Sequence, residues 1–460
     1  MVEKKTQVIV DGILDLEEKY DLFSLKEQDV YIWKLVRVDI FQKIFMNVQG
    51  IEQIHLKDSS LNKWMDLLSI INNTVFRNPI FKGANKKDFI IEYPRKVNYN
   101  GEMIDPYTHF YLQNKQKGDY ELLEQRYVGR LVRSVWSTNS TMDYQMLFSK
   151  LLKFVTNVQM SDSNQKVLQE VANEIQDKFN VKINVIELAH TKLKNFIAIY
   201  KVFNYTFRKT KPNNLLLVVS YVSEAIIAAA RNNQVNVIEF QHGVIGPLHL
   251  GYHFPNNEKV PYFPDEIYLF GEFWGNATAL PKSVKKVYYG YPYLKEYISN
   301  HLNEIDQKVE KEVVVISQGT IGKELSEVVF DLATRLPDYT FNYKLHPGEF
   351  GRWKKDYPKL VELEKLPNVQ VFEGEKNLYD LFASSSFVIG VYSTAIYEAI
   401  AFKARPIILK LPGYEYMTEL ETQFNVPILD TFEAVKNYIV DYQNYHVDLD
   451  INAIFADLYK

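Results

Sequence analysis

From about residue 210 to residue 442, short apolar runs alternate with segments rich in helix-forming residues. The run at residues 215–219 precedes a helical pattern at 223–231, and a second apolar run follows at 235–240. Apolar runs of this length are typical of strands that are buried on both faces. Because strands that alternate with helices form parallel sheets covered by helices, the pattern predicts an α/β protein.

One charged stretch, NEIDQKVEKE at residues 303–312, interrupts this alternation. The alternation then resumes, with strands expected at 313–317, 340–345, 369–372, 387–391 and 406–410. A chain of 460 residues also exceeds what one hydrophobic core usually organises. We therefore expect two α/β domains, at residues 1–305 and 306–442, and a tail at 443–460 that packs back on the first.

The first 200 residues are less regular. Helical patterns at 11–20, 26–48, 61–73 and 163–179 mix with Tyr-rich, irregular segments such as 93–113. We interpret this part as helical additions to the first domain. A separate helical domain at the N-terminus is the alternative.

Composition narrows the function. The chain has no cysteine, so thiolate catalysis and Cys-ligated metals are excluded, and no apolar run has the roughly 18 residues of a membrane helix. The 53 basic and 57 acidic residues argue against nucleic-acid binding. Because no apolar run is long enough for a membrane helix, we expect a cytoplasmic protein. Residues 1–310 hold 38 Lys and Arg against 35 Asp and Glu, while residues 311–460 hold 15 against 22. The slight excess of positive charge in residues 1–310 is compatible with peripheral contact of this part with the inner face of the membrane.

The sharpest local motif is Gln241-His242-Gly243, which follows an expected strand. Ligands in parallel sheets bind beyond the carboxyl ends of strands, so His242 is placed to face a cleft. An imidazole there can take a proton from a hydroxyl, although it can also simply fix the loop by hydrogen bonding. Glu224, at the start of an expected helix, is the alternative base. It can also be a solvent-exposed helix residue without a catalytic role.

Two further motifs follow expected strands of the second domain. Lys344 and His346 of the KLHP motif are two residues apart on an extended chain, so their side chains point to the same side and can both contact a phosphate. Pro347 sets the direction of the chain that follows. In YSTAIYE, Ser393 or Thr394 would cap a helix whose N-terminus can hold an anion.

Other positions were considered beside these motifs. Glu398 lies four residues after Thr394, on the same helix face, where it can accept from ribose hydroxyls. The turn SQGTIGK, with Gly319 and Thr320, can close over a nucleotide, although it matches neither common phosphate-loop pattern. His249 and His253 have the spacing of metal ligands on a helix, but nearby Gly and Pro residues argue against a helix, so no metal site is expected.

As an ordered set, QHG (241–243), KLHP (344–347) and YSTAIYEA (392–399) resemble motifs of bacterial GT-B glycosyltransferases of capsule and cell-wall polymer synthesis. The similarity covers about residues 210–425 and extends to polysialyltransferase-like, capsular Kdo-transferase-like and CDP-glycerol glycerophosphotransferase-like enzymes. It implies two Rossmann-like domains facing across a cleft, with the donor nucleotide in the C-terminal domain and the acceptor in the N-terminal one. It also implies inverting, metal-independent transfer, without a cofactor, from a CMP-linked donor of sialic acid or Kdo type.

By this resemblance, His346 looks like a phosphate-contacting histidine, with Ser393 and Thr394 beside it, and His242 looks like a proposed base. Gln241 stands where the glycerophosphotransferases usually carry Trp, and the acidic-acidic-Gly motif of the polysialyltransferases is absent. The expected partners are a nucleotide-sugar donor and a glycan or lipid-linked glycan acceptor. The alternatives are a CDP-glycerol-type glycerophosphotransferase, a UDP-sugar transferase or 2-epimerase, and a non-catalytic nucleotide-sugar-binding subunit of a capsule assembly complex.

Overall fold

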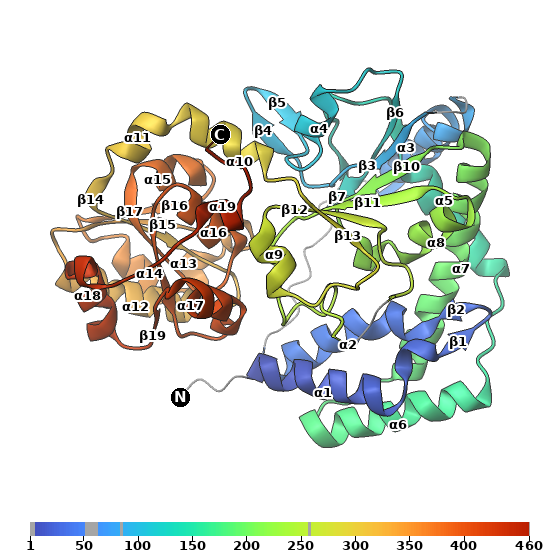
Figure 1. Cartoon of the computed structure of the whole chain (residues 1–460), viewed down its shortest axis with the longest axis horizontal. Helices are drawn as coiled ribbons and strands as arrows, with labels where there is room; N and C mark the ends of the chain where they lie inside the picture. The colour runs from blue at the N-terminus through green and yellow to red at the C-terminus, as the bar shows by residue number, and fades with distance from the viewer. Residues whose placement is uncertain (1–4, 51–62, 83–85, 256–258, 460) are drawn as a thin grey trace.

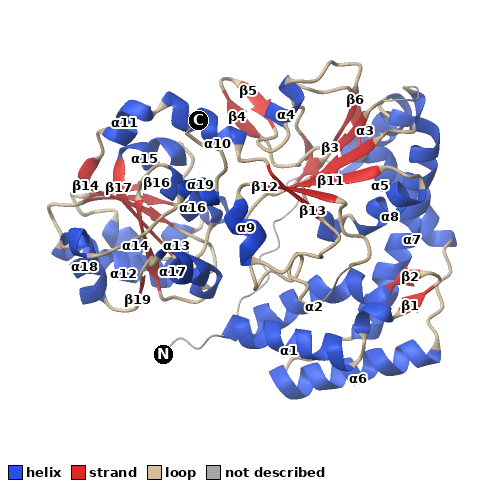
Figure 2. Ribbon diagram, viewed as in Figure 1, coloured by secondary structure: helices blue, strands red, loops and turns tan. Residues whose placement is uncertain are grey.

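Two parallel β-sheets with surrounding helices organise the chain (Figures 1 and 2). The computed structural model describes residues 5–50, 63–82, 86–255 and 259–459. Seven strands form the first sheet and six form the second. The predicted α/β class with two Rossmann-like units is therefore confirmed.

The first sheet has the order β13-β12-β11-β10-β3-β6-β9, and all of its pairings are parallel. In chain order this is the Rossmann arrangement, whose switch point lies between β3 and β10. The strands are β3 (Asp88–Ile91), β6 (Tyr120–Glu124), β9 (Ser140–Thr141), β10 (Asn214–Leu217), β11 (Asn236–Phe240), β12 (Glu266–Leu269) and β13 (Lys285–Tyr288).

The second sheet has the order β16-β15-β14-β17-β18-β19, again all parallel, with its switch point between β14 and β17. Its strands are β14 (Val309–Ile316), β15 (Thr340–Lys344), β16 (Val369–Phe372), β17 (Ser385–Gly390), β18 (Arg405–Leu409) and β19 (Ile428–Leu429). The five strands expected from the sequence in this unit are thus present, within four residues of their predicted ends.

Helices flank both sheets (Figure 2). Those of the first part are α1 (Lys5–Lys19), α2 (Ile32–Gln49), α3 (Lys63–Phe76), α4 (His109–Gln113), α5 (Asp143–Val155), α6 (Asp162–Phe179), α7 (Val185–Thr210), α8 (Glu224–Asn232), α9 (Glu272–Ala277), α10 (Pro292–Asn300) and α11 (Leu302–Asp306). Those of the second are α12 (Gly322–Arg335), α13 (Trp353–Asp356), α14 (Pro358–Leu363), α15 (Leu378–Ser384), α16 (Thr394–Ala401), α17 (Thr418–Phe424), α18 (Phe432–Val440) and α19 (Ile451–Ile454). Within the described ranges, no helix combines the length and the apolar composition needed to cross a bilayer.

The N-terminal helices pack onto the first sheet's unit. Helices α1, α2, α6 and α7 share an apolar core with Ala225 of α8 and with Leu248 and Leu250 of the loop after β11. In addition, β3, β6 and β9, all from the first 150 residues, are strands of the first sheet. The first 200 residues therefore contribute both helices and strands to one unit.

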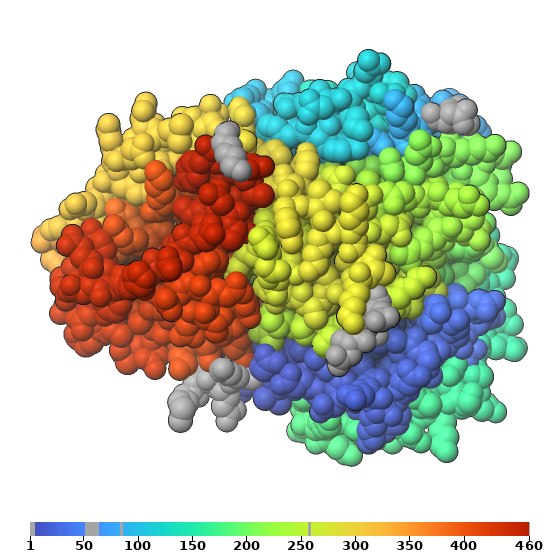
Figure 3. Space-filling model, viewed as in Figure 1, coloured from blue at the N-terminus to red at the C-terminus, as the bar shows by residue number. Residues whose placement is uncertain are grey.

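The C-terminal segment returns to the first unit (Figure 3). The indole Nε1 of Trp274 donates to the carbonyl of Ile454 at 2.8 Å, and the amide of Ala456 donates to the carbonyl of Phe270 at the same distance. Gly271 leaves room for this approach, since a Cβ there would lie 2.3 Å from the carbonyl oxygen of Ala453. The tail thus continues from the second α/β unit in the chain and packs on the first.

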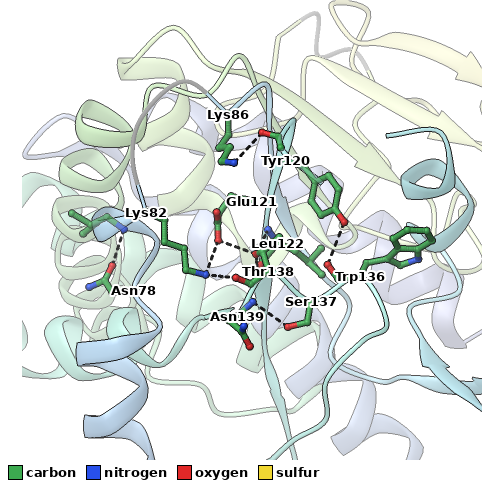
Figure 4. Close-up of polar contacts among 12 residues, drawn as sticks. Asn78, Lys82, Lys86, Tyr120, Glu121, Leu122, Trp136, Ser137, Thr138 and Asn139 are labelled. Atoms are coloured by element: carbon green, nitrogen blue, oxygen red, sulfur yellow. Dashed lines mark hydrogen bonds and ion pairs between the residues drawn. The ribbon is translucent and has the colours of Figure 1, made fainter. Parts of the chain in front are cut away.

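A polar network holds the outer edge of the first sheet in place (Figure 4). The buried carboxylate of Glu121 lies 3.4 Å from the ammonium of Lys82 and accepts from the hydroxyl of Thr138 at 2.8 Å. The same hydroxyl accepts from the amide of Leu122 at 3.0 Å, and Lys82 also donates to the carbonyl of Thr138. This network fixes the segment before β9 and the end of the 3₁₀ turn Pro79–Phe81 against β6.

Candidate active site

A cleft of about 470 Å³ lies between the two α/β units. It opens at the carboxyl ends of β14, β15 and β17, beside the switch point of the second sheet, where ligands of such sheets bind. The first unit contributes Tyr93, Arg95, Tyr107, Tyr291 and Tyr293 to its lining. The structure also brings seven residues singled out from the sequence to this cleft: His242, Lys344, His346, Pro347, Ser393, Thr394 and Glu398.

The loop after β15 presents the His346 ring with a defined tautomer. Its Nδ1 accepts a hydrogen bond from the amide of Gly348 at 3.1 Å, and its own amide donates to Glu349 Oε2 at 2.7 Å. Because Nδ1 is an acceptor, the proton of the neutral ring resides on Nε2. Burial and the charges of Arg95 and Arg352 lower the pKa of His346, so the ring is neutral near neutral pH and offers an N–H donor.

Two cations approach the same place from opposite units. Lys344, at the end of β15, donates to the carbonyl of Glu373, and burial lowers its pKa. Arg95 comes from the first unit, is exposed, and acts on His346 across the cleft. Sequence reasoning missed Arg95, since neither a motif nor a strand end marks it. The cleft therefore has a positively charged end that suits an anionic group.

Helix α16 points its N-terminus at the cleft. Ser393 is the N-cap, because its side chain accepts from the amide of Ala395 at 3.1 Å. The hydroxyl of Thr394 lies against the loop after β11, where a Cβ on Gly243 would come within 3.3 Å of it. A glycine at 243 thus allows the two units to approach closely, beside a helix end that favours negative charge.

Glu398 lies one helical turn further along α16, inside a ring of tyrosines. Burial raises its pKa to about 7, and its charge in turn helps to raise the pKa values of Tyr107, Tyr291, Tyr293 and Tyr379. Three of these tyrosines belong to the first unit. A carboxylate in this position can accept hydrogen bonds from hydroxyl groups of a ligand that spans both units.

We expect Glu398→Gln to change the pH dependence of stability. The pKa of Glu398 is about 7 in the folded chain against 4.5 ordinarily, so the folded state binds more protons between these values. This carboxyl therefore lowers the stability of the wild type as pH rises from about 4.5 to about 7, and the loss persists above that range. The variant should match the wild type in acid and exceed it above neutral pH, by about 3 kcal/mol at most.

Urea unfolding followed by circular dichroism across this pH range measures the difference. Glu327→Gln, at an exposed position of α12, is the matched control and should show no such gain. A stability difference between Glu398→Gln and the wild type that does not vary with pH would contradict the assignment.

His242 lines this cleft, beside the rings of Tyr93 and Tyr221, which also line a second cavity. Its Nδ1 is buried and has no hydrogen-bond partner among the residues that the structure describes. The rings of Tyr93, Tyr221 and Tyr252 surround it at 6.3, 6.3 and 6.4 Å. Burial lowers the pKa of His242 to about 4, and a contact with the Val218 backbone offsets only part of this effect. The ring is therefore neutral near neutral pH and has a free lone pair or proton at Nδ1.

The second cavity, of about 410 Å³, lies at the switch point of the first sheet. Ile91 at the end of β3 and residues 217–219 at the end of β10 line it. Its polar lining includes the side chains of Gln125, Gln145, Asn195 and Lys192. Tyr93 lines both cavities, so the two cavities share a wall near His242.

Several predicted residues lie elsewhere. Glu224 does not line the cleft; it lines the second cavity, where Lys34 Nζ lies 3.4 Å from its Oε1 and burial raises its pKa. Gln241 is buried, and its amide donates to the Gly243 carbonyl and accepts from the Phe270 amide, both at 2.8 Å. It therefore holds the loop rather than facing an acceptor.

Gly319 and Thr320 are also not brought to the cleft. The carbonyl of Gly319 accepts from Arg352 at 3.0 Å, and the hydroxyl of Thr320 lies 2.5 Å from that of Tyr392. Their neighbours Ser317 and Gln318 line the cleft instead. The Oε1 atom of Gln318 is buried and unpartnered within the described part of the chain, which makes it a candidate contact that sequence reasoning missed.

His249 and His253, which have the spacing of metal ligands on a helix, lie in a loop instead. The chain from His249 to His253 forms turns rather than a helix, and His249 Nδ1 accepts from the amide of Gly251 at 3.1 Å. Over the described ranges, no group of three or more His, Asp or Glu side chains is placed to hold a metal ion.

Comparisons with known proteins give one related sequence and several similar structures. No family model matches the chain. The UDP-N-acetylglucosamine--N-acetylmuramyl-(pentapeptide) pyrophosphoryl-undecaprenol N-acetylglucosamine transferase of Sulfurihydrogenibium sp. (strain YO3AOP1) is 26% identical over 159 residues. The match covers 34% of this chain and 42% of that protein, so the chain spans less than half the length of this relative.

Two solved structures are similar over most of the chain at low sequence identity. The UDP-GlcNAc 2-epimerase from Neisseria meningitidis, bound to UDP-GlcNAc, is 12% identical, with a TM-score of 0.45, and covers 78% of this chain and 93% of its own. MurG from Acinetobacter baumannii is 10% identical, with a TM-score of 0.44, and covers 78% of this chain and 90% of its own.

Proposed function

We propose that this chain is a glycosyltransferase of the GT-B type, which binds a nucleotide-sugar donor in the cleft between its two units. The observation that carries the proposal is the convergence of His346, Lys344 and the N-terminus of α16 at one switch point, facing His242. In this proposal, residues 306–442 bind the donor and residues 1–305 bind the acceptor. The tail at 443–460 packs on the first unit.

The donor phosphates lie at the positive end of the cleft. The Nε2–H of His346, the ammonium of Lys344 and the amides at the start of α16 are hydrogen-bond donors of residues that line the same cleft. When the bond between the sugar and the phosphate breaks, negative charge grows on the departing phosphate oxygen. Donors that are already in position stabilise this charge without reorganisation, which is usually a large part of catalysis.

The acceptor hydroxyl approaches from the second cavity. Its oxygen forms a bond to the anomeric carbon as the bond from that carbon to the phosphate breaks, and its proton passes to the imidazole of His242. The phosphates of a bound donor raise the pKa of this buried ring from its low value of about 4, and so improve it as a base. Attack from the face opposite the phosphate inverts the configuration of the anomeric carbon.

The nucleotide is proposed to be uridine diphosphate. The name of the curated relative contains UDP-N-acetylglucosamine, and the similar 2-epimerase from Neisseria meningitidis is bound to UDP-GlcNAc. The CMP-linked donor and the CDP-glycerol donor implied by the sequence motifs therefore have no support from the comparisons. Glu398, within its ring of tyrosines, is proposed to accept hydrogen bonds from the ribose hydroxyls.

The second cavity favours transfer over epimerisation. A 2-epimerase converts the sugar nucleotide itself and needs no room for another substrate. Here a separate cavity of about 410 Å³ shares Tyr93 with the cleft, and its neutral amide side chains suit the hydroxyl groups of a glycan. A glycan, free or lipid-linked, is thus the proposed acceptor.

A thermal-shift panel tests donor recognition. We expect UDP to stabilise the protein most, with smaller shifts for CMP, CDP, GDP and ADP, since a ligand at about 100 times its dissociation constant adds roughly 2.7 kcal/mol. Stabilisation by cytidine nucleotides alone would contradict the uridine donor and restore the CMP and CDP-glycerol alternatives. The absence of any shift would contradict nucleotide binding altogether.

A further inference from the structure

Helix α3 has its apolar face turned to the outside. Trp64, Leu68, Ile71 and Val75 recur at the spacing of one helix face, and all four are exposed, Trp64 by 76%. The opposite face is polar but buried, and there Asn73 donates to Asp143 Oδ2 at 2.6 Å. A surface helix normally buries its apolar stripe and exposes its polar one, so α3 is inverted relative to the usual pattern.

The neighbouring helix α5 continues this surface. Helices α3 and α5 pack against each other, and Leu151, Phe154 and Val155 of α5 are exposed, Phe154 by 79%. On its inner side α5 buries the polar residues Asp143 and Ser149. We call the exposed residues Trp64, Leu68, Ile71, Val75, Leu151, Phe154 and Val155 the α3–α5 face.

Two lysines of α5 are adjacent in sequence to its exposed apolar residues. Lys150 and Lys153 lie on α5, and neither has an ion-pair partner in the part of the chain that the structure describes. The acidic residues of the two helices are directed elsewhere. Asp143 accepts from Arg126 at 2.8 Å, and Asp66 is near enough to help raise the pKa of the same arginine.

We propose that the α3–α5 face lies on the surface of a lipid bilayer that contains anionic lipid. Exposed aromatic and aliphatic side chains enter the acyl region, while lysines meet the negative headgroups. A symmetric contact with a second copy would place the same unpaired lysines near one another, which disfavours that occupant. Lipid supplies the complementary charge.

The position of this face leaves the cleft free. Helices α3 and α5 lie at the far side of the first unit from the second sheet (Figure 1). The exposed Phe81 follows α3 in the chain and directly precedes Lys82, which the contacts with Glu121 and Thr138 hold in place (Figure 4). The proposed membrane contact therefore does not cover the cleft.

Co-sedimentation with vesicles tests the proposal. The probes are vesicles of phosphatidylcholine alone and of phosphatidylcholine mixed with phosphatidylglycerol, at low and high salt. The wild type should bind the mixed vesicles at low salt and bind less at high salt. Trp64→Ser/Leu68→Ser/Phe154→Ser should weaken binding by at least about 100-fold, because these side chains no longer enter the acyl region. Lys150→Gln/Lys153→Gln should weaken it by about 25-fold, at roughly 5-fold for each lysine.

A control variant distinguishes the effect of the α3–α5 face from the effect of exposed apolar side chains in general. Val8→Ser/Tyr205→Ser/Val440→Ser removes three exposed apolar side chains from other helices and should bind as the wild type does. Circular dichroism establishes that each variant is folded. Equal vesicle binding by the wild type and the α3–α5 variants would overturn the proposal, as would a wild type that ignores both kinds of vesicle.

Analytical ultracentrifugation without lipid tests whether a second copy of the chain, rather than lipid, occupies the α3–α5 face. A wild-type dimer that the α3–α5 substitutions convert to a monomer, with no vesicle binding, would overturn the lipid proposal in favour of self-association. None of these readouts needs a donor or an acceptor. Their failure is therefore distinguishable from failure of the proposed transferase function.

Discussion

Replacing His242 by alanine is expected to reduce sugar transfer by about 100- to 10,000-fold while leaving donor binding nearly unchanged. The ring lines the cleft, with a buried Nδ1 that has no partner in the described chain. The contacts proposed for the donor phosphates come from His346, Lys344 and α16, which the substitution does not touch. The turnover number should therefore fall and the affinity for UDP should not.

Steady-state kinetics and calorimetric titration with UDP measure the two quantities. His446→Ala, at an exposed position near the C-terminus, is the matched control and should behave as the wild type. If His242→Ala transfers within about tenfold of the wild-type rate, general base catalysis by this residue is wrong. Glu224, which lines the second cavity, would then be the next base to test.

Replacing His346 by alanine is expected to lower both the turnover number, by about 100- to 1,000-fold, and the affinity for the nucleotide diphosphate. The hydrogen bond from Gly348 to Nδ1 leaves Nε2–H as a donor for the departing phosphate. Its contribution should be larger in the transition state than in the ground state, because the charge on that phosphate grows as the sugar leaves. The loss of rate should thus exceed the loss of affinity.

The comparison of turnover number with binding of UDP and of uridine resolves this point. Uridine lacks phosphates, so His346→Ala should bind it as well as the wild type does. His190→Ala, at an exposed position of α7, serves as the control. Equal losses for uridine and UDP would mean that the substitution disturbs the cleft generally and would contradict a phosphate contact.

Much of the fold could be predicted from the sequence, because buried parallel strands such as β14, β17 and β18 contain short apolar runs, at residues 313–316, 387–389 and 407–409. Strands β3 and β6 were missed. Their sequences, DFII and YELLE, mix apolar residues with acidic ones that are buried through tertiary pairings. Asp88, for example, lies 2.9 Å from Lys115, which follows a helix distant in sequence from β3. No local pattern reveals such a pairing.

The candidate site divides in the same way. His242, His346 and Thr394 follow strand ends, so the topology rule placed them together before any coordinates. Arg95, Tyr107 and Tyr291 come from irregular segments whose path depends on tertiary packing, whereas Tyr293 and Tyr379 lie in the first turns of α10 and α15. Gln241 and Thr320 were expected at the site because of their neighbours, but their side chains are engaged within their own loops. Proximity in sequence to a site residue did not predict side-chain direction.

A crystal structure of the protein grown with UDP tests the central claim most directly. The account predicts nucleotide density in the cleft between the two units, with the diphosphate at the N-terminus of α16 and within hydrogen-bond distance of His346 Nε2 and Thr394 Oγ1. The ribose should lie beside Glu398. Nucleotide bound elsewhere, or a cleft that stays empty at saturating UDP while another nucleotide fills it, would contradict the assignment of this cleft as a UDP-sugar site.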